Sequence, residues 1–146
     1  MSKWQIMENS RYEKIYKVEP ADIDQLGHVN NIIYLKWVQD IAVAHWCTLT
    51  TPEQQSSTYW VVVRHEIDYR HPARLGDAVI ARTWVGAAHG LHFERFTDIL
   101  RTGDNDLLAS ARTVWCPIDS ATGRPHRVAP EIRALFSTPE KQSGAS

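Results

Sequence analysis

The chain has 146 residues, which favours a single domain. Hydrophobic residues make up 43% of the sequence and charged residues 23%, a balance typical of globular proteins that excludes a disordered chain. Sixteen basic side chains against 17 acidic ones give a net charge of -1. This balance argues against nucleic-acid binding, because such domains usually carry a basic excess.

Nothing in the sequence indicates export or a membrane. The N-terminus lacks the apolar stretch of a secretory signal, and no segment approaches the ~20 apolar residues of a membrane span. Cys47 and Cys116 form no C-x-x-C pair, and we expect both as small buried side chains in a reducing compartment. We therefore expect a soluble cytoplasmic protein, with one domain over residues 1–136 and a disordered polar tail over 137–146.

The expected elements are a strand, a long helix and four more strands. Residues 31–47 contain no Gly or Pro, follow Asn30 as a helix cap and are apolar nearly all round, which predicts a helix buried on most sides. A period of two predicts the strand 59–71, with its apolar face at the odd-numbered positions. The other strands are expected at 11–18, 78–86, 91–101 and 107–117, and a short helix at 130–136.

Short turns separate the last four strands, which predicts antiparallel neighbours in chain order. A single helix covers only one face of such a sheet. We therefore expect an α+β fold, in which a five-stranded antiparallel sheet wraps around one long apolar helix.

The segment just before the helix is the richest in chemistry. Asp24 and His28 precede a helix that starts at Asn31, and the unpaired N–H groups of a helix start can hold a developing oxyanion. A carboxylate folded back beside them can act as a nucleophile or as a base toward water. The alternative is structural: Asn30 and Asn31 cap the helix, and Asp24 accepts hydrogen bonds from its own loop. The spacing alone favours neither.

Three motifs in order resemble one known family. The first is Asp24-x-x-Gly27-His28-Val29-Asn30-Asn31-x-x-Tyr34, and the others are the segments 67–77 and 115–123. Together they are similar to hotdog-fold acyl-CoA thioesterases of the hydroxybenzoyl-CoA thioesterase-like family, over about residues 11–135. The resemblance implies a hotdog fold and a hydrolase that cleaves an acyl-CoA thioester to the free acid and CoA, without a metal or other cofactor.

By position, the resemblance makes Asp24 the catalytic carboxylate and the backbone N–H of Asn31 the oxyanion donor. His28 matches a histidine of acyl-carrier-protein thioesterases and long-chain acyl-CoA members, which favours an aliphatic acyl group. The plant carrier-protein thioesterases, however, have Asn where this chain has Leu26. The resemblance further implies that three other residues of this motif bind the substrate: Gly27, Asn30 and Tyr34.

Two weaker features concern phosphate and metal. Arg124 and Arg127 form a basic cluster that is either an exposed turn or a site for a CoA phosphate. His65-Glu66 begins like the zinc motif H-E-x-x-H, but Tyr69 replaces the second histidine, so no metal site is expected.

We expect a homodimer, or a homotetramer built as a dimer of dimers. The strand 59–71 is rich in apolar residues and contains no Gly or Pro that would prevent pairing with another chain. Pairing with its own copy would satisfy the hydrogen-bonding groups of its backbone. Val63, Arg64 and His65 would then complete the acyl or CoA pocket of the partner chain.

Two other functions fit the same fold. A hotdog enoyl-CoA hydratase uses an Asp and a His in a D-x-N-P-x-H pattern, but Asp24 and His28 are one residue closer and enclose no Asn-Pro. A non-catalytic module that binds acyl-CoA or a protein partner would not need Asp24, whose carboxylate is costly beside a buried apolar helix.

Overall fold

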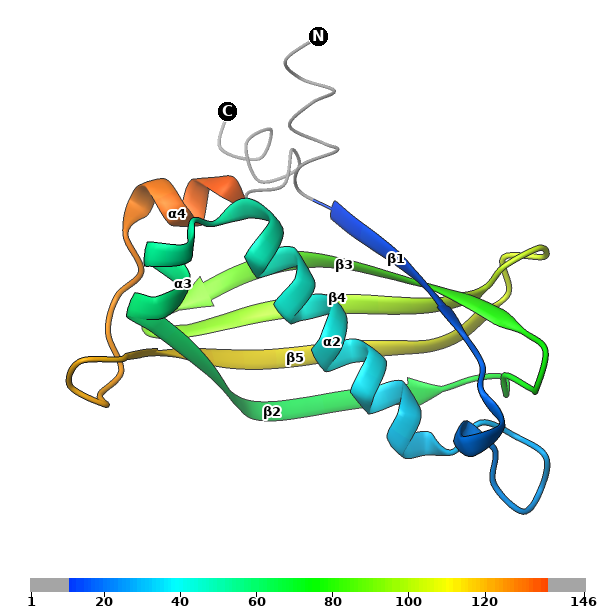
Figure 1. Ribbon diagram of the computed structural model, residues 1–146. Coiled ribbons are helices and arrows are strands. Elements are labelled where there is room, and N and C mark those ends of the chain that lie inside the picture. The colour runs from blue at the N-terminus through cyan, green and yellow to red at the C-terminus, as the bar shows by residue number, and fades with distance from the viewer. Residues whose placement is uncertain (1–10, 137–146) are drawn as a thin grey trace, which may run out of the picture.

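The chain folds as one antiparallel sheet with a long helix, α2, lying across one of its faces, as Figure 1 shows. The computed structural model describes residues 11–136, so the expected tail at 137–146 lies outside the described residues. The α+β architecture with a five-stranded sheet is confirmed. In chain order the elements are β1 (Arg11–Lys17), the 3-10 helix η1 (Pro20–Asp22), α2 (Asn31–Leu49), α3 (Pro52–Ser57), β2 (Thr58–Tyr69), β3 (Ala78–His89), β4 (His92–Arg101), β5 (Leu107–Asp119) and α4 (Pro130–Leu135).

The strand order is β1-β3-β4-β5-β2, so β2 lies at one edge and pairs with β5 rather than with β3. The prediction that the last four strands are neighbours in chain order is therefore wrong at its first step. The link over 70–77 can extend to about 26 Å, whereas β2 and β3 are three strand spacings, about 14 Å, apart. This link is long enough to cross the sheet, unlike the turn that joins β3 to β4.

A β-bulge at Val63 corrects the predicted face of β2. Val62 and Arg64 pair with consecutive residues of β5, which leaves Val63 as an extra residue on the ladder. Tyr59, Val61 and Val63 are 50%, 38% and 51% exposed, whereas the odd-numbered side chains just beyond the bulge are half-buried. The prediction of a single apolar face along the whole strand is therefore wrong. The extra residue at Val63 moves the inward-facing side chains from even-numbered to odd-numbered positions.

Helix α2 packs one side against the sheet and leaves another side open. Its first turn is capped by the side chain of Asn30, which accepts a hydrogen bond from the Ile32 N–H at 3.1 Å. Ile32 and Val43 are 68% and 55% exposed, so this chain alone does not cover the helix on most sides as predicted. The residues that α2 buries are Tyr34, Trp37, Val38, Ile41, Ala42 and His45.

The two cysteines are free but differ in burial. Cys116 is buried as expected, whereas Cys47 is exposed on the last turns of α2, so the prediction of a buried side chain is wrong there. Within residues 11–136, no helix combines the length and the hydropathy needed to cross a membrane.

Candidate active site

The predicted catalytic residues Asp24 and His28 lie in one closed loop directly before α2, and Asn31 is the first residue of that helix. A backbone bridge joins Ile23 to Val29, and the Asn30 N–H donates to the Asp22 carbonyl at 2.8 Å. The Val29 N–H donates to the Ala73 carbonyl at 2.8 Å, which ties the loop to the link between β2 and β3. Figure 1 shows this loop at the end of the molecule where α2 begins. The loop is therefore held in a defined position beside the helix start.

Asp24 uses one carboxylate oxygen to close this loop. Its Oδ1 accepts hydrogen bonds from the N–H groups of Leu26 at 2.9 Å and His28 at 3.1 Å. Gly27 makes the turn between them at a φ of 80°, a conformation that other side chains rarely adopt. Oδ2 makes no hydrogen bond to any residue in the described part of the chain. The structural role of Asp24 is therefore real, and it leaves one oxygen available for chemistry.

The start of α2 presents backbone N–H groups beside the loop. The Asn30 side chain accepts a hydrogen bond from the Ile32 N–H, and the Asn30 carbonyl accepts one from the Ile33 N–H at 2.9 Å. The Asn31 N–H makes no hydrogen bond to a residue within 11–136. Because a helix start carries a partial positive charge, this free N–H is suited to stabilise an oxyanion.

Tyr34 is enclosed in the core rather than exposed in the loop, at 2% exposure. Its hydroxyl accepts a hydrogen bond from the Ala73 N–H at 2.8 Å, and the rings of Trp37 and Tyr69 pack edge-on against it. Burial raises the pKa of Tyr34, so the phenol stays protonated at neutral pH. Since Ala73 also holds Val29, Tyr34 positions the loop through this segment.

The other predicted binding residues lie away from Asp24. Arg124 and Arg127 are exposed and follow β5, at the opposite end of the molecule from the start of α2. The 12 residues of β2 span about 40 Å between these two ends. Val63 and Arg64 are exposed midway along it. One chain therefore does not bring the basic cluster to the loop.

His65 faces the interior from β2. Its Nδ1 lies 3.2 Å from the Thr113 hydroxyl, and its Nε2 is enclosed with no hydrogen-bond partner among the described residues. Burial lowers the pKa of His65 below its ordinary value of 6.5. No group of three His, Cys, Asp or Glu side chains within residues 11–136 is placed to hold a metal ion.

The lowered pKa of the half-buried His65 predicts a pH-dependent stability. As pH falls below about 6.5, the unfolded chain takes up a proton that the folded state disfavours, so the free energy of unfolding decreases. We expect His65→Gln to flatten this part of the profile, measured by urea unfolding between about pH 5 and 7.5. His89→Gln, at an exposed turn, is the matched control. Identical profiles for the unaltered protein and His65→Gln would contradict this interpretation.

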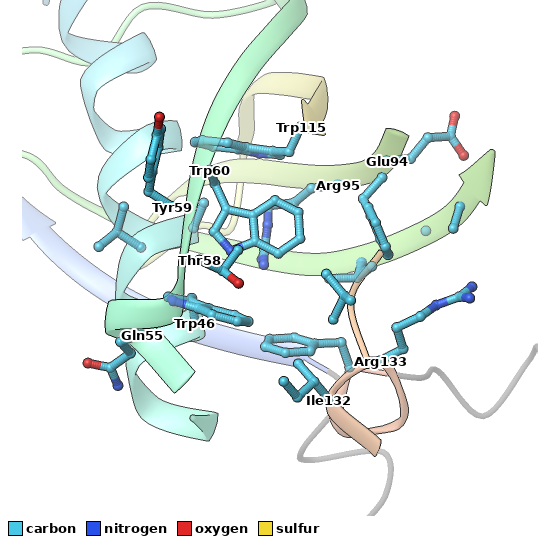
Figure 2. Close-up of a pocket in the computed structure, with 18 of the residues that line it drawn as sticks. Trp46, Gln55, Thr58, Tyr59, Trp60, Glu94, Arg95, Trp115, Ile132 and Arg133 are labelled. Carbon is cyan, nitrogen blue, oxygen red and sulfur yellow. The ribbon is translucent and has the colours of Figure 1, made fainter. Parts of the chain in front are cut away.

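A cavity of about 600 Å³ lies at the other end of α2, far from Asp24. Figure 2 shows Arg95 in this cavity, behind the Trp60 ring. The sequence analysis missed the cavity because its walls come from separate parts of the chain. The alternation along β4, which puts Arg95 on the same face as the buried Ile99, was the available signal. We call it the aromatic pocket, after its wall residues Trp46, Trp60, Phe93, Trp115 and Phe136.

Comparison with known proteins places the chain in a family. The model of the thioesterase-like superfamily matches residues 18–136, and the chain belongs to this superfamily. The resemblance inferred from the three motifs is thereby confirmed. No curated protein is detectably similar to the chain.

Solved structures share the fold at low sequence identity. A thioesterase from Thermus thermophilus, in complex with coenzyme A and Zn, is 22% identical over 86% of this chain and 97% of its own, with a TM-score of 0.76. DHNA-CoA thioesterase from Staphylococcus aureus is 16% identical over 92% and 94%, with a TM-score of 0.78. A 4-hydroxybenzoyl-CoA thioesterase mutant in complex with 4-hydroxybenzoyl-CoA is 16% identical over 88% and 99%, with a TM-score of 0.77. These similarities confirm the hotdog fold.

Proposed function

We propose that the protein hydrolyses acyl-CoA thioesters, with the loop before α2 as its catalytic centre. The observation that carries the proposal is the Asp24 carboxylate, which closes the loop with Oδ1 and keeps Oδ2 unbonded within the described residues. Membership of the thioesterase-like superfamily supports it, as do the CoA thioesters named for the similar structures.

In the proposed reaction the thioester carbonyl lies at the start of α2, where the Asn31 N–H stabilises the oxyanion. Asp24 either attacks the carbonyl carbon, so that an anhydride forms and the CoA thiolate leaves, or takes a proton from an attacking water. In the first route, water then cleaves the anhydride and restores the carboxylate. Hydroxylamine distinguishes the routes, because only the anhydride route can leave a hydroxamate on the Asp24 side chain, which a mass spectrum of the protein detects. His28 orients the loop or the water, while Gly27 and Asn30 shape the turn and the cap around the substrate.

The proposed working unit is a homodimer or a dimer of dimers. β2 is an edge strand, so it can pair with its own copy across a two-fold axis. Antiparallel pairing brings the end of one chain that carries Arg124 and Arg127 toward the Asp24 loop of the other. The two arginines can then hold CoA phosphates. Val63, Arg64 and His65, midway along β2, would complete the acyl or CoA pocket between the partner's Asp24 loop and this basic cluster.

Release of free thiol from a panel of acyl-CoAs tests the proposed function in the purified protein, with no cofactor added. We expect thiol release, fastest with aliphatic acyl groups. A hydratase would instead change the absorbance of an enoyl-CoA without releasing thiol. A binding module would bind acyl-CoA and give neither signal. Absence of thiol release from every acyl-CoA, by folded protein, contradicts the proposal.

A further inference from the structure

A buried cation, Arg95, lies in the aromatic pocket and forms no ion pair with a carboxylate among the described residues. Arg95 points inward from β4 and is 7% exposed. Its Nη1 donates to His45 Nδ1 at 2.9 Å and to the Thr83 hydroxyl at 3.1 Å. Neither Nε nor Nη2 of Arg95 donates to any residue in the described part of the chain. Within residues 11–136, these two nitrogens of the guanidinium are therefore available to bind a ligand.

The nearby carboxylate does not balance this charge. Glu94, the next residue on β4, lines the pocket but pairs with Arg112, whose Nε donates to its Oε2 at 2.6 Å. Its Oε1 accepts from the Ala87 N–H at 3.3 Å. Among residues 11–136, no carboxylate oxygen lies within 4 Å of Arg95.

An uncompensated guanidinium in an apolar enclosure is costly. Desolvation lowers the pKa of Arg95 to about 10, which still leaves the side chain charged at neutral pH. The unused Nε and Nη2 groups form the edge that binds a carboxylate through two parallel hydrogen bonds. A second cation, Arg133, lies over the Phe93 ring with its guanidinium carbon 5.6 Å from the ring centroid. The pocket therefore combines apolar walls with one buried cation, Arg95, and one exposed cation, Arg133.

We infer that the aromatic pocket binds an apolar carboxylate, that is, a carboxyl group on an aliphatic or aromatic body, with Arg95 pairing with the carboxylate. The volume of about 600 Å³ is in the range of small-molecule sites, and the ring-lined walls suit the apolar body. A phosphate fits less well, because its second negative charge would stay unpaired beside the one buried guanidinium of an apolar pocket.

The ligand has two possible sources, a free carboxylic acid or the far end of an acyl group that carries a second carboxylate. His45, which contacts Arg95, is about 20 Å along α2 from Asn31. A short acyl group held at the loop of the same chain therefore cannot reach the pocket. An acyl group held at the partner's loop can reach it in the proposed β2-paired dimer, and this second source rests on the proposed function.

Binding of decanoate and decanol to the protein of residues 1–146 tests the inference without relying on turnover. Tryptophan fluorescence reports occupancy, because three tryptophans line the pocket, and calorimetry confirms the affinities. We expect decanoate to bind at least about tenfold more tightly than decanol. Arg95→Met should abolish this preference while decanol binding persists, and Arg95→Lys should retain part of it. Arg82→Met, which removes an arginine paired with Glu13 away from the pocket, should leave the preference unchanged.

Equal affinity for decanoate and decanol in the unaltered protein would overturn the inference, and so would an unchanged preference in folded Arg95→Met. Melting curves check that each variant is folded; removal of an unpaired buried charge is expected to be tolerated. If Arg95→Met does not fold, the affinities for decanoate and decanol in the unaltered protein and in Arg95→Lys still test the inference.

Kinetics then separate the two sources. If the acyl terminus is the ligand, Arg95→Met lowers kcat/KM for a mono-CoA thioester of a dicarboxylic acid, relative to a monocarboxylic acyl-CoA of the same length. If a free acid is the ligand, Arg95→Met leaves that ratio unchanged. Decanoate then alters the rate of hydrolysis of a short acyl-CoA by the unaltered protein but not by Arg95→Met. The binding result stands even when no thioester is hydrolysed, so failure of the proposed function is distinguishable from failure of this site.

Discussion

Asp24→Asn is expected to lower kcat by about 10²-fold or more without unfolding the protein. The side-chain amide keeps an oxygen that can accept the N–H groups of Leu26 and His28, so the loop keeps its two closing hydrogen bonds. The amide cannot act as a base or form an anhydride. Thiol release at saturating acyl-CoA measures the loss, and a melting curve checks the fold.

The matched control is Asp22→Asn, the same substitution in the same loop. The Asp22 Oδ2 accepts a hydrogen bond from the Glu19 N–H at 2.9 Å, and an Asn oxygen can replace it. Near-normal kcat is expected for this variant. Near-normal kcat in Asp24→Asn would remove Asp24 from the mechanism, whereas equal losses in both variants would indicate damage to the loop rather than to the chemistry.

The loop and the helix were predictable because their interactions are local. Asp24, the turn at Gly27 and the cap at Asn30 lie within one short stretch, and their hydrogen bonds join residues two to four positions apart. Residue type and spacing therefore determine this geometry. The contact of Tyr34 with Ala73, 39 positions away, depends on the fold and could not be inferred from spacing.

Features that depend on long-range pairing were not predictable. Which strands pair determines both the position of β2 beside β5 and the bulge at Val63. A sequence pattern with a period of two predicts a strand but does not identify the strand with which it pairs. Arg95 is a similar case, because a single charged residue within an alternating strand is normally solvated. Only the packing of α2 and its His45 over β4 shows that this arginine is enclosed.

The position of β2 at the edge of the sheet predicts that substitutions in this strand will disrupt the proposed dimer. Tyr59, Val61 and Val63 are exposed on an edge strand, an arrangement that promotes pairing with another chain. The proposed antiparallel pairing of two copies satisfies the free backbone groups of β2. In the proposed dimer it also brings Arg124 and Arg127 of one chain toward the Asp24 loop of the other, which a single chain does not do. Loss of pairing should therefore remove activity together with the dimer.

We expect Val61→Glu combined with Val63→Glu to convert the proposed dimer to a monomer of 16.7 kDa and to reduce thiol release by about tenfold or more. Both side chains are exposed in the single chain, so the fold should survive, whereas like charges facing each other across paired strands repel. Light scattering at low micromolar concentration measures the mass. Ile15→Glu is the matched control, since Ile15 is 66% exposed on β1, the opposite edge of the sheet, and its substitution should leave mass and rate unchanged. A fully active monomer of the unaltered protein would refute both the strand pairing and the shared site.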